Sequence, residues 1–563
     1  MGLAAPSLTT GFVADDWLQL LITRGWQSRL PGLPTSKLDL FSFAGHTVGG
    51  NLAAMDTGMF PWWADPECKL AFFRPLASLT HILDWTLWPD SPVVMHAHNL
   101  LWFALACTAV AFVYRRFCAD AFTAGLATLL YAWDDAHGPA LGWIANRNAM
   151  MALAFALPVL IIHDRVRRDG WRPGVWLGPL LLGVALCCGE SALAVVGYLV
   201  AHAICLDHGK LATRLLRLWP YLVVVILWRT VYDHLGYGTA NSGIYLDPGA
   251  SPRAFWTAFP ERALWLVAGQ LAGPWSDLGV MFPYMSMRIY HVALVAAAAG
   301  AAFVIAFLVP QVRRDPTARF FALGAAFCIV PIASTFPSDR LLWFVGIGAM
   351  ALIAQFLTTR PLAPAGTLAF LFLIVVHVIL APPLLVMRSR SMDTVDLPLK
   401  RGDHALPSTP DMVDRTVVLV NPPADFYSGY LPIRRAAFGE PRPKFRSLAT
   451  GFDGVKLTRV DDRTLVVTPA KGYLFHISEH MLRSRPMAPH ASVHLTGVQI
   501  DVLTMTADGR PASARFRFDV PLEDRSLYFA KWVGRTYQPF PLPAIGETVV
   551  LPPIDFLESL AKD

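Results

Sequence analysis

The sequence predicts a polytopic α-helical membrane protein with a mostly β domain after its last membrane helix. Of its 563 residues, 54% are hydrophobic and 16% are charged, whereas soluble domains average roughly 45–50% and 25%. The hydrophobic residues form runs without interior charge, such as 94–114 and 365–387, and runs of this length cross a bilayer as helices. After residue 390 the apolar residues alternate with polar ones instead.

Ten runs of this kind predict a bundle of about 10–11 transmembrane helices. The predicted spans are 94–114, 121–134, 147–163, 174–187, 191–206, 218–233, 289–311, 319–336, 340–358 and 365–387. Residues 1–390 are therefore predicted to form one transmembrane domain, in which 11–92 is the first outer loop.

Basic residues occupy every second short loop between these spans. They are Arg115 and Arg116, then Arg165, Arg167, Arg168 and Arg172, then Lys210, Arg214 and Arg217, then Arg313, Arg314 and Arg319, and finally Arg360. Such loops stay in the cytoplasm, which places the opposite loops and everything after residue 388 outside it. We expect an integral protein of the bacterial inner membrane. The net charge of +6 is explained by these loops, so no nucleic-acid partner is indicated.

Residues 391–563 are predicted to form a β-sandwich-like domain on the extracytoplasmic side. The segments 498–502 and 516–520 alternate apolar with polar residues, and Asp508-Gly509 between them is typical of a hairpin turn. Aromatic residues in this domain either stack on a sugar or fill the core. They are Tyr528, Phe529, Trp532 and Tyr537.

Polar side chains gather at five places that are all predicted on the extracytoplasmic side. These places are Asp15 with Asp16, Arg74 with His81, the group Asp134, Asp135, His137 and Arg147, then Glu190, and finally Asp339 with Arg340. Charged groups inside a bilayer are costly, at about 2.5–3.5 kcal/mol on insertion scales. Because all five places are predicted at a similar depth in the membrane, they indicate one outward-opening cavity. The alternative is that each group caps or anchors a helix, as Asp339 would directly before a span.

Short motifs in a fixed order carry a family resemblance. They are Phe12-Val13-Ala14-Asp15-Asp16-Trp17, Phe73-Arg74-Pro75-Leu76, His96-Ala97-His98-Asn99-Leu100-Leu101, Gly142-Trp143-Ile144-Ala145-Asn146-Arg147, Gly189-Glu190-Ser191 and Ser338-Asp339-Arg340-Leu341-Leu342. In this order they resemble the GT-C superfamily of membrane glycosyltransferases, especially its transmembrane O-mannosyltransferase-like branch. The resemblance covers most of the first 390 residues.

The resemblance implies a hexosyl or pentosyl transferase that uses a polyprenyl-phosphate-linked sugar donor at the non-cytoplasmic face. Asp15 or Asp16 matches the catalytic base. The cations that match the donor-phosphate site are Arg74, Arg147 and Arg340, since the planar guanidinium can bind a phosphate with two hydrogen bonds. A buried Arg can equally pair structurally with Glu190 or Asp339.

Further residues are candidates for binding the acceptor or a metal ion. They are Asp134, Asp135, His137, Glu190 and Asp339. Carboxylates with an imidazole can ligate Mg²⁺ or Mn²⁺, so a divalent ion is left open. The acceptor is equally open between protein, lipid and polysaccharide.

Departures from the family pattern keep two other functions open. The chain has Asp134-Asp135-Ala136-His137 where the family has a His-Pro-x-His element, Gly189-Glu190 for Lys-Glu, and Asp339-Arg340 for Glu-Arg. The family's first membrane helix would precede Asp15, so we expect either unaided insertion of a short segment or a missing first helix. The alternatives are a non-catalytic anchor that presents the C-terminal domain, and a transporter or flippase of lipid-linked glycans.

Overall fold

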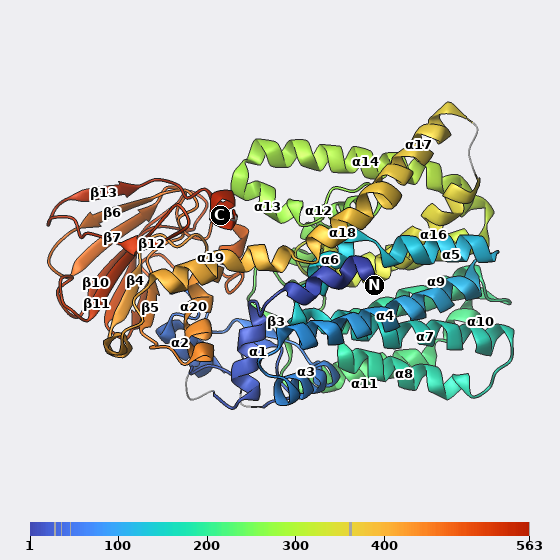
Figure 1. Cartoon of the computed structure of the whole chain (residues 1–563), viewed down its shortest axis with the longest axis horizontal. Coiled ribbons are helices and arrows are strands. Elements are labelled where there is room, and N and C mark those ends of the chain that lie inside the picture. Colours follow the sequence, from blue (N-terminus) through green and yellow to red (C-terminus); the bar gives the residue numbers. More distant parts are fainter. Residues whose placement is uncertain (27–29, 35, 46, 360–362, 562–563) are drawn as a thin grey trace. The chain divides into compact units, whose positions relative to one another are not determined.

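The computed structural model describes residues 1–26, 30–34, 36–45, 47–359 and 363–561, so Arg360 lies outside the described residues. The chain forms two compact units (Figure 1). Unit 1 comprises Met1–Phe12, Phe72–Tyr237 and Asp247–Met392. Unit 2 comprises Val13–Ala71, Gly238–Leu246 and Asp393–Asp563, so part of the predicted first outer loop is compact with the C-terminal residues.

Unit 1 is an α-helical bundle, and every predicted span is helical. The helices at the predicted spans are α4 (Pro92–Phe117), α5 (Ala121–Ala132), α7 (Arg147–Arg168), α8 (Gly174–Cys188), α9 (Ala194–Cys205), α11 (Trp219–His234), α14 (Met287–Arg314), α15 (Pro316–Ile332), α16 (Trp343–Thr359) and α17 (Pro364–Ile374), which continues through the π-helical segment η7 (Val375–Leu380) into α18 (Ala381–Arg388). Figure 1 shows α4, α7, α8 and α11 side by side, and consecutive members of this row are in contact.

Shorter elements and one further long helix complete unit 1. They are η1 (Gly2–Thr9), α3 (Pro75–Leu87), η3 (Asp135–His137), α6 (Gly138–Leu141), η4 (Ile144–Asn146), η5 (Glu190–Leu193), α10 (Leu211–Leu216), α12 (Pro252–Leu271), α13 (Leu278–Met285) and η6 (Asp339–Leu341). The predictions did not include α3 and α12.

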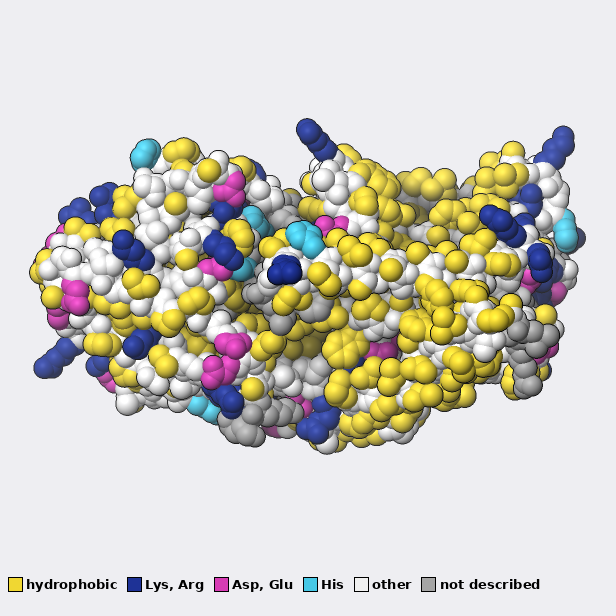
Figure 2. All heavy atoms as spheres, turned by 90° about the horizontal axis from the view of Figure 1, so that it is seen from above, with side chains coloured by type: hydrophobic (Ala, Val, Ile, Leu, Met, Phe, Trp, Pro, Cys, Tyr) yellow, Lys and Arg dark blue, Asp and Glu magenta, His cyan; other side chains and the backbone are white. Residues whose placement is uncertain are grey.

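The described part of unit 1 has the composition of an integral membrane protein. Four helical stretches are long and apolar enough to cross a bilayer: Pro92–Phe117, Ile144–Arg168, Met287–Arg314 and Pro364–Ala405, the last of which continues past Met392 into residues of unit 2. Four shorter apolar helices accompany them: Gly174–Cys188, Glu190–Cys205, Pro316–Ile332 and Trp343–Thr359. Hydrophobic side chains cover most of the visible surface of this unit (Figure 2), as lipid contact requires.

Helix α16 lies at the centre of the bundle, and nearly all of its side chains are buried. Three buried tyrosines donate hydrogen bonds to its first carbonyls: Tyr131 to Trp343 at 2.8 Å, Tyr198 to Phe344 at 2.8 Å and Tyr114 to Ile347 at 2.7 Å. Gly324 lets α15 approach α9 closely, because a Cβ at this position would lie 2.2 Å from the Tyr198 ring. Small residues and interhelical hydrogen bonds are what hold helices together in lipid.

Unit 2 contains two facing sheets. Its six-stranded antiparallel sheet has the order β13 (Thr548–Leu551), β6 (Val455–Arg459), β7 (Thr464–Pro469), β10 (Pro511–Phe518), β9 (Val498–Met505), β8 (Ser492–Leu495). The four-stranded sheet has the order β12 (Thr536–Pro539), β11 (Leu527–Val533), β4 (Thr416–Leu419), β5 (Lys444–Ser447), with β4 parallel to both neighbours. The predicted hairpin at Asp508-Gly509 is confirmed, since β9 and β10 pair across it.

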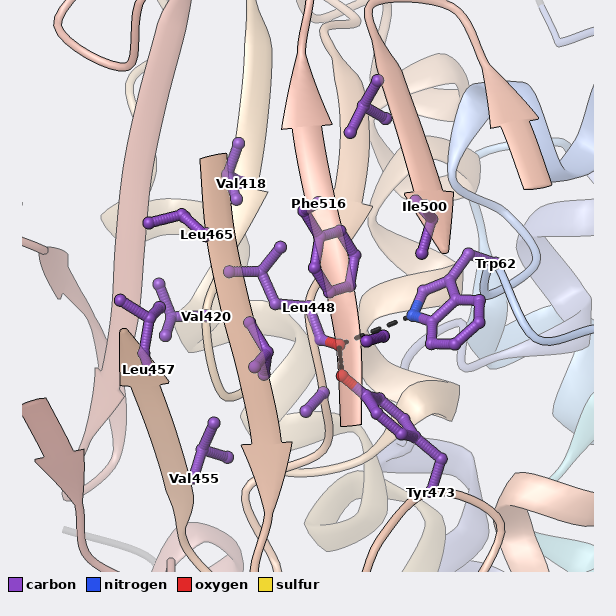
Figure 3. Close-up of a cluster of buried hydrophobic side chains, with 14 of the residues drawn as sticks. Trp62, Val418, Val420, Leu448, Val455, Leu457, Leu465, Tyr473, Ile500 and Phe516 are labelled. Carbon is purple, nitrogen blue, oxygen red and sulfur yellow. Dashed lines mark hydrogen bonds between the residues drawn. The ribbon is translucent and has the colours of Figure 1, made fainter. Parts of the chain in front are cut away.

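The core of unit 2 draws on residues that precede the membrane helices. Trp62 packs among the inward side chains of both sheets (Figure 3). Trp63 belongs to the same core cluster. The Trp62 indole and the Tyr473 hydroxyl both donate to the Leu448 carbonyl, at 3.5 and 3.0 Å. Phe529, Trp532 and Tyr537 are also buried, so these aromatics fill the cores of the unit.

Helices cover the outer face of the four-stranded sheet. They are α19 (Ser391–Ala405) and α20 (Asp425–Phe438), whose apolar residues join a second core cluster with Val417, Leu419 and Phe445. The remaining helices of the unit are α1 (Asp15–Thr23), α2 (Val48–Thr57) and α21 (Phe556–Leu560). The small sheet β1 (Ser42–Ala44), β2 (Lys69–Ala71), β3 (Gly238–Ala240) joins the two early segments of the unit.

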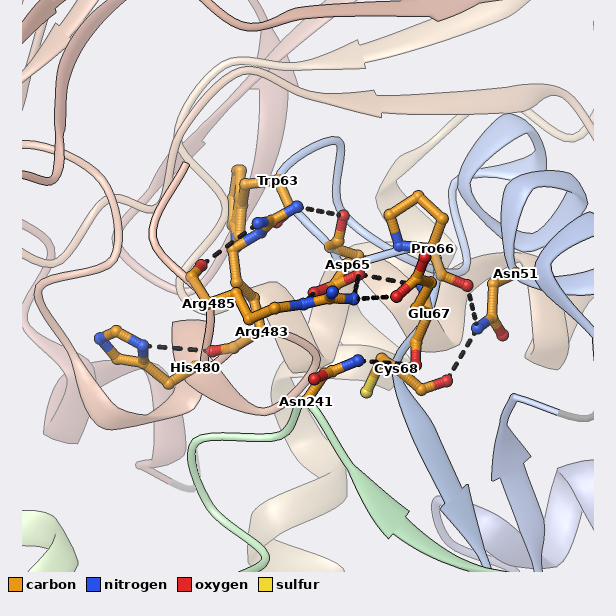
Figure 4. Close-up of polar contacts among 11 residues, drawn as sticks. Asn51, Trp63, Asp65, Pro66, Glu67, Cys68, Asn241, His480, Arg483 and Arg485 are labelled. Carbon is orange, nitrogen blue, oxygen red and sulfur yellow. Dashed lines mark hydrogen bonds and ion pairs between the residues drawn. The ribbon is translucent and has the colours of Figure 1, made fainter. Parts of the chain in front are cut away.

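Polar contacts fasten the segment before β2 to the C-terminal residues (Figure 4). Arg485 forms a bidentate ion pair with Asp65, with N···O distances of 2.7 and 3.0 Å. Arg483 donates to the carbonyls of Trp63 and Ala64. Within the early segment itself, the Asn51 amide donates to the Pro66 and Cys68 carbonyls, at 2.8 Å each. The early segment is therefore a structural part of unit 2.

Candidate functional site

One arginine of unit 1 gathers three carboxylates. Arg388, at the end of α18, lies 2.8 Å from the carboxylate oxygens of Asp135 and Asp339 and 3.3 Å from that of Asp277. Its guanidinium also lies over the Trp275 ring at 4.6 Å, and the Trp275 indole donates to Asp135 at 3.0 Å. We call Arg388 with Asp135, Asp277 and Asp339 the Arg388 cluster.

Local backbone contacts explain how the cluster forms. A Cβ at Gly138 would lie 2.6 Å from the Arg388 side chain, and one at Gly142 would lie 2.4 Å from the Ser389 carbonyl. Glycine at both positions therefore lets α6 pack directly on the end of α18. The Ser276 N–H donates to the second oxygen of Asp339 at 2.8 Å, which fixes that carboxylate.

Burial and neighbouring charges act on Asp339 and Asp135 of the Arg388 cluster. Burial raises the pKa of Asp339 to about 7, with Asp277 adding to the rise and Arg388 opposing it. Burial and the neighbouring Asp134 raise the pKa of Asp135. Like charges at close range disfavour full ionisation, and Arg388 opposes this effect at both Asp339 and Asp135.

The candidate acceptor or metal ligands Asp134, Asp135 and Asp339 have protein partners. Arg388 already occupies the space between the carboxylates of the cluster. Asp134 accepts from Gln270 at 2.8 Å and from the Ala136 N–H. Among the described residues, no group of three or more His, Cys, Asp or Glu side chains has a metal-binding arrangement. These residues do not fit Mg²⁺ or Mn²⁺ as they stand.

His137 points into the bundle. Its Nε2 lies 3.0 Å from the Tyr131 carbonyl, and its ring stacks on Trp343 at 4.1 Å between centroids. Burial lowers the pKa of His137 to about 3. The ring is therefore neutral and acts as a core group.

Arg340 has a different environment from its neighbour Asp339. Its guanidinium lies over the Trp143 and Phe336 rings, at 5.4 and 5.5 Å from their centroids. Within the described part of the chain no carboxylate forms an ion pair with it, and its side chain is partly exposed. A guanidinium held between aromatic faces keeps its donors for an anion.

Arg74 and Glu190 form an ion pair. The Nε of Arg74 lies 2.8 Å from Glu190, and both side chains are about one-fifth exposed, at 19% and 22%. The guanidinium also lies over the Phe72 ring. The structural pairing of an Arg with Glu190 that the sequence left open is thus present, and the pair retains a solvent-exposed edge.

Arg147 is fully buried. It forms an ion pair with the buried Asp84, donates to Asn99 at 2.6 Å, and donates to the Met95 carbonyl at 3.2 Å. Asp84 in turn lies 2.7 Å from His98. Arg147 thereby joins α7 to α3 and α4.

The sequence analysis did not single out Asp84 or Arg388. For Arg388 a signal was available, because it is an arginine at the end of a predicted span, on the side predicted to be acidic.

Asp15 and Asp16 belong to unit 2 and differ in their roles there. Asp16 is fully buried, and its carboxylate accepts from the Val13 N–H at 3.0 Å at the start of α1. Asp15 is partly exposed and accepts a hydrogen bond from the Tyr430 hydroxyl. Ala14 before them has φ 45° and ψ −114°. A non-glycine residue with positive φ is strained, and such strain is often found at functional sites.

Known proteins offer little guidance. No protein-family model matches the chain, and no curated protein matches it. Two similar solved structures are crystal structures of ArnT from Cupriavidus metallidurans, bound to undecaprenyl phosphate and in the apo state. Both are 12% identical with a TM-score of 0.37; the match covers 79% of this chain and 87% and 83% of theirs. At this level the function has to be argued from the chain's own residues.

Proposed function

We propose that this protein is a glycosyltransferase of the GT-C type, which moves a sugar from a polyprenyl-phosphate-linked donor to an acceptor at the non-cytoplasmic face. The observation that carries the proposal is the contrast between two arginines. Arg388 is neutralised by three carboxylates, whereas Arg340 is held by Trp143 and Phe336 and pairs with no carboxylate of the described chain. Arg340 is available for a phosphate.

Two arginines bind the donor phosphate in this proposal. Negative charge grows on the phosphate as the sugar departs, and a fixed cation stabilises that charge in the transition state. Arg340 supplies this cation, and Arg74 supplies a second one whose Glu190 partner fixes the guanidinium. We assign the fully buried Arg147 and the core residue His137 to structure.

Asp15 is the base. Its carboxylate takes the proton of the acceptor hydroxyl or amine, while the acceptor atom forms a bond to the anomeric carbon. The bond from that carbon to the phosphate oxygen breaks, and the polyprenyl phosphate leaves with the electron pair. Asp16 holds the start of α1 through Val13. No step requires a metal ion.

The C-terminal residues lie outside the cytoplasm in this proposal. The basic loop at 313–319 is cytoplasmic by the positive-inside rule, and an odd number of crossings follows it. An alkaline phosphatase fusion at residue 400 should be active. Activity of only a cytoplasmic reporter at that position would reverse this topology.

The test is complementation of a strain that lacks the gene, with cell-surface glycans measured by mass spectrometry and protein abundance measured in the same membranes. Arg340→Lys keeps the charge but loses the bidentate hydrogen bonding of the guanidinium to a phosphate, so sugar transfer should fall at normal protein abundance. Arg288→Lys is the matched control, because Arg288 is exposed on α14. Glycans that are unchanged when the whole gene is deleted would favour the membrane-anchor function instead.

A further inference from the structure

The outer face of the six-stranded sheet in unit 2 carries a polar pocket. The pocket has a volume of about 500 Å³, within the range of about 300–1,000 Å³ of pockets that bind small molecules. It is lined by residues of β7, β9 and β10 and of the turn between β6 and β7. Apart from Val460, these residues have charged or polar side chains. No step of the proposed transfer uses any of them.

Two arginines of β10 line this pocket because of the register of the strand. Ala514, Phe516 and Phe518 are buried in the core of unit 2. Side chains alternate between the two faces along a strand, so Arg515 and Arg517 project from the opposite, outer face, where both are exposed.

Arg517 differs from the other arginines of the pocket. It lies between Thr464 of β7 and Gln499 of β9, its cross-strand neighbours, and no carboxylate of the described chain lies within ion-pair distance of it. The hydrogen bond from the Arg463 N–H, together with smaller effects that include the charge of Arg517, holds the pKa of Asp461 below its ordinary value. Arg517 therefore lies near an ionised carboxylate without being bound by it.

The other two arginines of the pocket already have protein partners. Arg515 donates to the Asp501 carboxylate, at 3.1 and 3.3 Å, and Arg463 donates to the Asp519 carbonyl at 2.9 Å. These bonds fix part of the lining. Arg517 is the guanidinium of the pocket whose donors remain for a ligand.

The charges of the lining indicate the kind of ligand. A guanidinium with available donors can bind a carboxylate through two hydrogen bonds. The carboxylates of Asp461, Asp462 and Asp501 belong to the same lining, and they would repel a polyanion such as a nucleic acid or a sulfated chain. An ionised carboxylate accepts hydrogen bonds at several lone pairs, so it can bind hydroxyl groups. A chain of hydroxyl groups with isolated carboxylates matches both features.

We propose that this pocket binds an acidic oligosaccharide, in which Arg517 binds a uronic acid carboxylate while Asp461 and Asp462 accept hydrogen bonds from sugar hydroxyls. This binding function goes beyond the proposed transfer reaction, because it belongs to unit 2 and requires nothing of the residues of unit 1. The sugar is held by polar side chains of the sheet, and the buried aromatic residues of unit 2 take no part.

The experiment titrates purified full-length protein in detergent with a hexamer of galacturonic acid, and isothermal titration calorimetry gives the Kd. Arg517→Gln removes the available guanidinium, so the Kd should rise about 10-fold or more because a hydrogen bond to a charged group is lost. Arg517→Lys keeps the charge but not the bidentate geometry, so its Kd should be intermediate. Arg525→Gln is the matched control, because Arg525 is an exposed arginine of unit 2 that does not line the pocket. Its Kd should equal that of the unmodified protein.

Thermal unfolding shows whether the variants fold. Both substituted arginines are exposed, so all variants should unfold at the temperature of the unmodified protein. No binding of the galacturonate hexamer by the folded protein at millimolar concentration would overturn the proposal. An unchanged Kd in Arg517→Gln would also overturn it.

Two further sugars test the class of ligand. Maltohexaose offers hydroxyl groups without a carboxylate, and a heparin hexasaccharide offers many sulfates. Both should bind more weakly than the galacturonate hexamer. Equal or tighter binding of maltohexaose would show that the carboxylate is not recognised, and tighter binding of heparin would show a general site for polyanions. Either result would contradict the proposal.

Discussion

Asp339 and Arg340 are consecutive residues of one 3-10 turn, η6, yet their side chains lie in different environments. Asp339 is buried and bound by Arg388 at 2.8 Å, whereas Arg340 lies between two aromatic rings. The turn thus holds the Asp339 carboxylate inside the bundle, whereas the Arg340 guanidinium remains partly exposed. Arg388 holds Asp339, so it also holds the turn from which Arg340 projects.

The first prediction concerns the Arg388 cluster. Arg388→Met leaves Asp135, Asp277 and Asp339 without their shared cation, and loss of one partner of a buried pair costs about 3–5 kcal/mol. Thermal unfolding in detergent should therefore shift strongly downward. Arg288→Met, at an exposed position of α14, is the control.

Adding Asp339→Asn to Arg388→Met tests the cause. The double variant removes one of the uncompensated carboxylates, so it should recover part of the lost stability. Equal stability of the single and double variants would show that Arg388 does not stabilise the fold by compensating the charge of these carboxylates.

The second prediction concerns the core of unit 2. Trp62 is 3% exposed between the two sheets, and truncating a buried Trp costs about 3–5 kcal/mol. Trp62→Ala should lower the unfolding temperature of unit 2, while Val550→Ala, at a position 70% exposed, should have little effect. A fragment of residues 393–563 lacks both Trp62 and Trp63, so it should not unfold cooperatively. A cooperative transition in that fragment would contradict this account.

The third prediction concerns acid stability. Burial alone would raise the pKa of Asp65, but the hydrogen bond from Arg485 and the other contacts keep it below its ordinary value. A carboxyl group whose pKa is lower in the folded state stabilises the fold above its unfolded pKa, and this stabilisation is lost as pH falls. Unfolding temperatures of unit 2 should therefore decline below about pH 4, and Asp65→Asn should make the decline shallower. Parallel curves for the two proteins would refute this.

Helix positions followed from the sequence because each hydrophobic run is long enough to span lipid by itself. The run at 289–311, for example, lies within α14 (Met287–Arg314). Helix α12 has no such run, since Pro260, Glu261 and Arg262 interrupt it. Its helical state depends on packing against α14 and α16, which a local pattern does not report.

The site could be predicted only in part, for a related reason. Asp15, Asp339 and Arg340 lie in recognisable motifs, but their partners are distant in sequence. Arg388 is 253 positions from Asp135, and Tyr430 is 415 positions from Asp15. Local sequence also did not distinguish the adjacent Asp15 and Asp16, which differ because Asp16 turns back onto the Val13 N–H.

The measurement that tests the central claim most directly compares Asp15→Asn with Asp16→Asn in membranes of a strain that lacks the gene. Transfer per molecule of protein is the readout. Asp15→Asn removes the proton acceptor at a partly exposed position, so transfer should fall about 10²–10⁴-fold with normal abundance. Asp16→Asn weakens the start of α1, so abundance should fall while transfer per molecule is largely retained. Full transfer by Asp15→Asn at normal abundance would contradict the account.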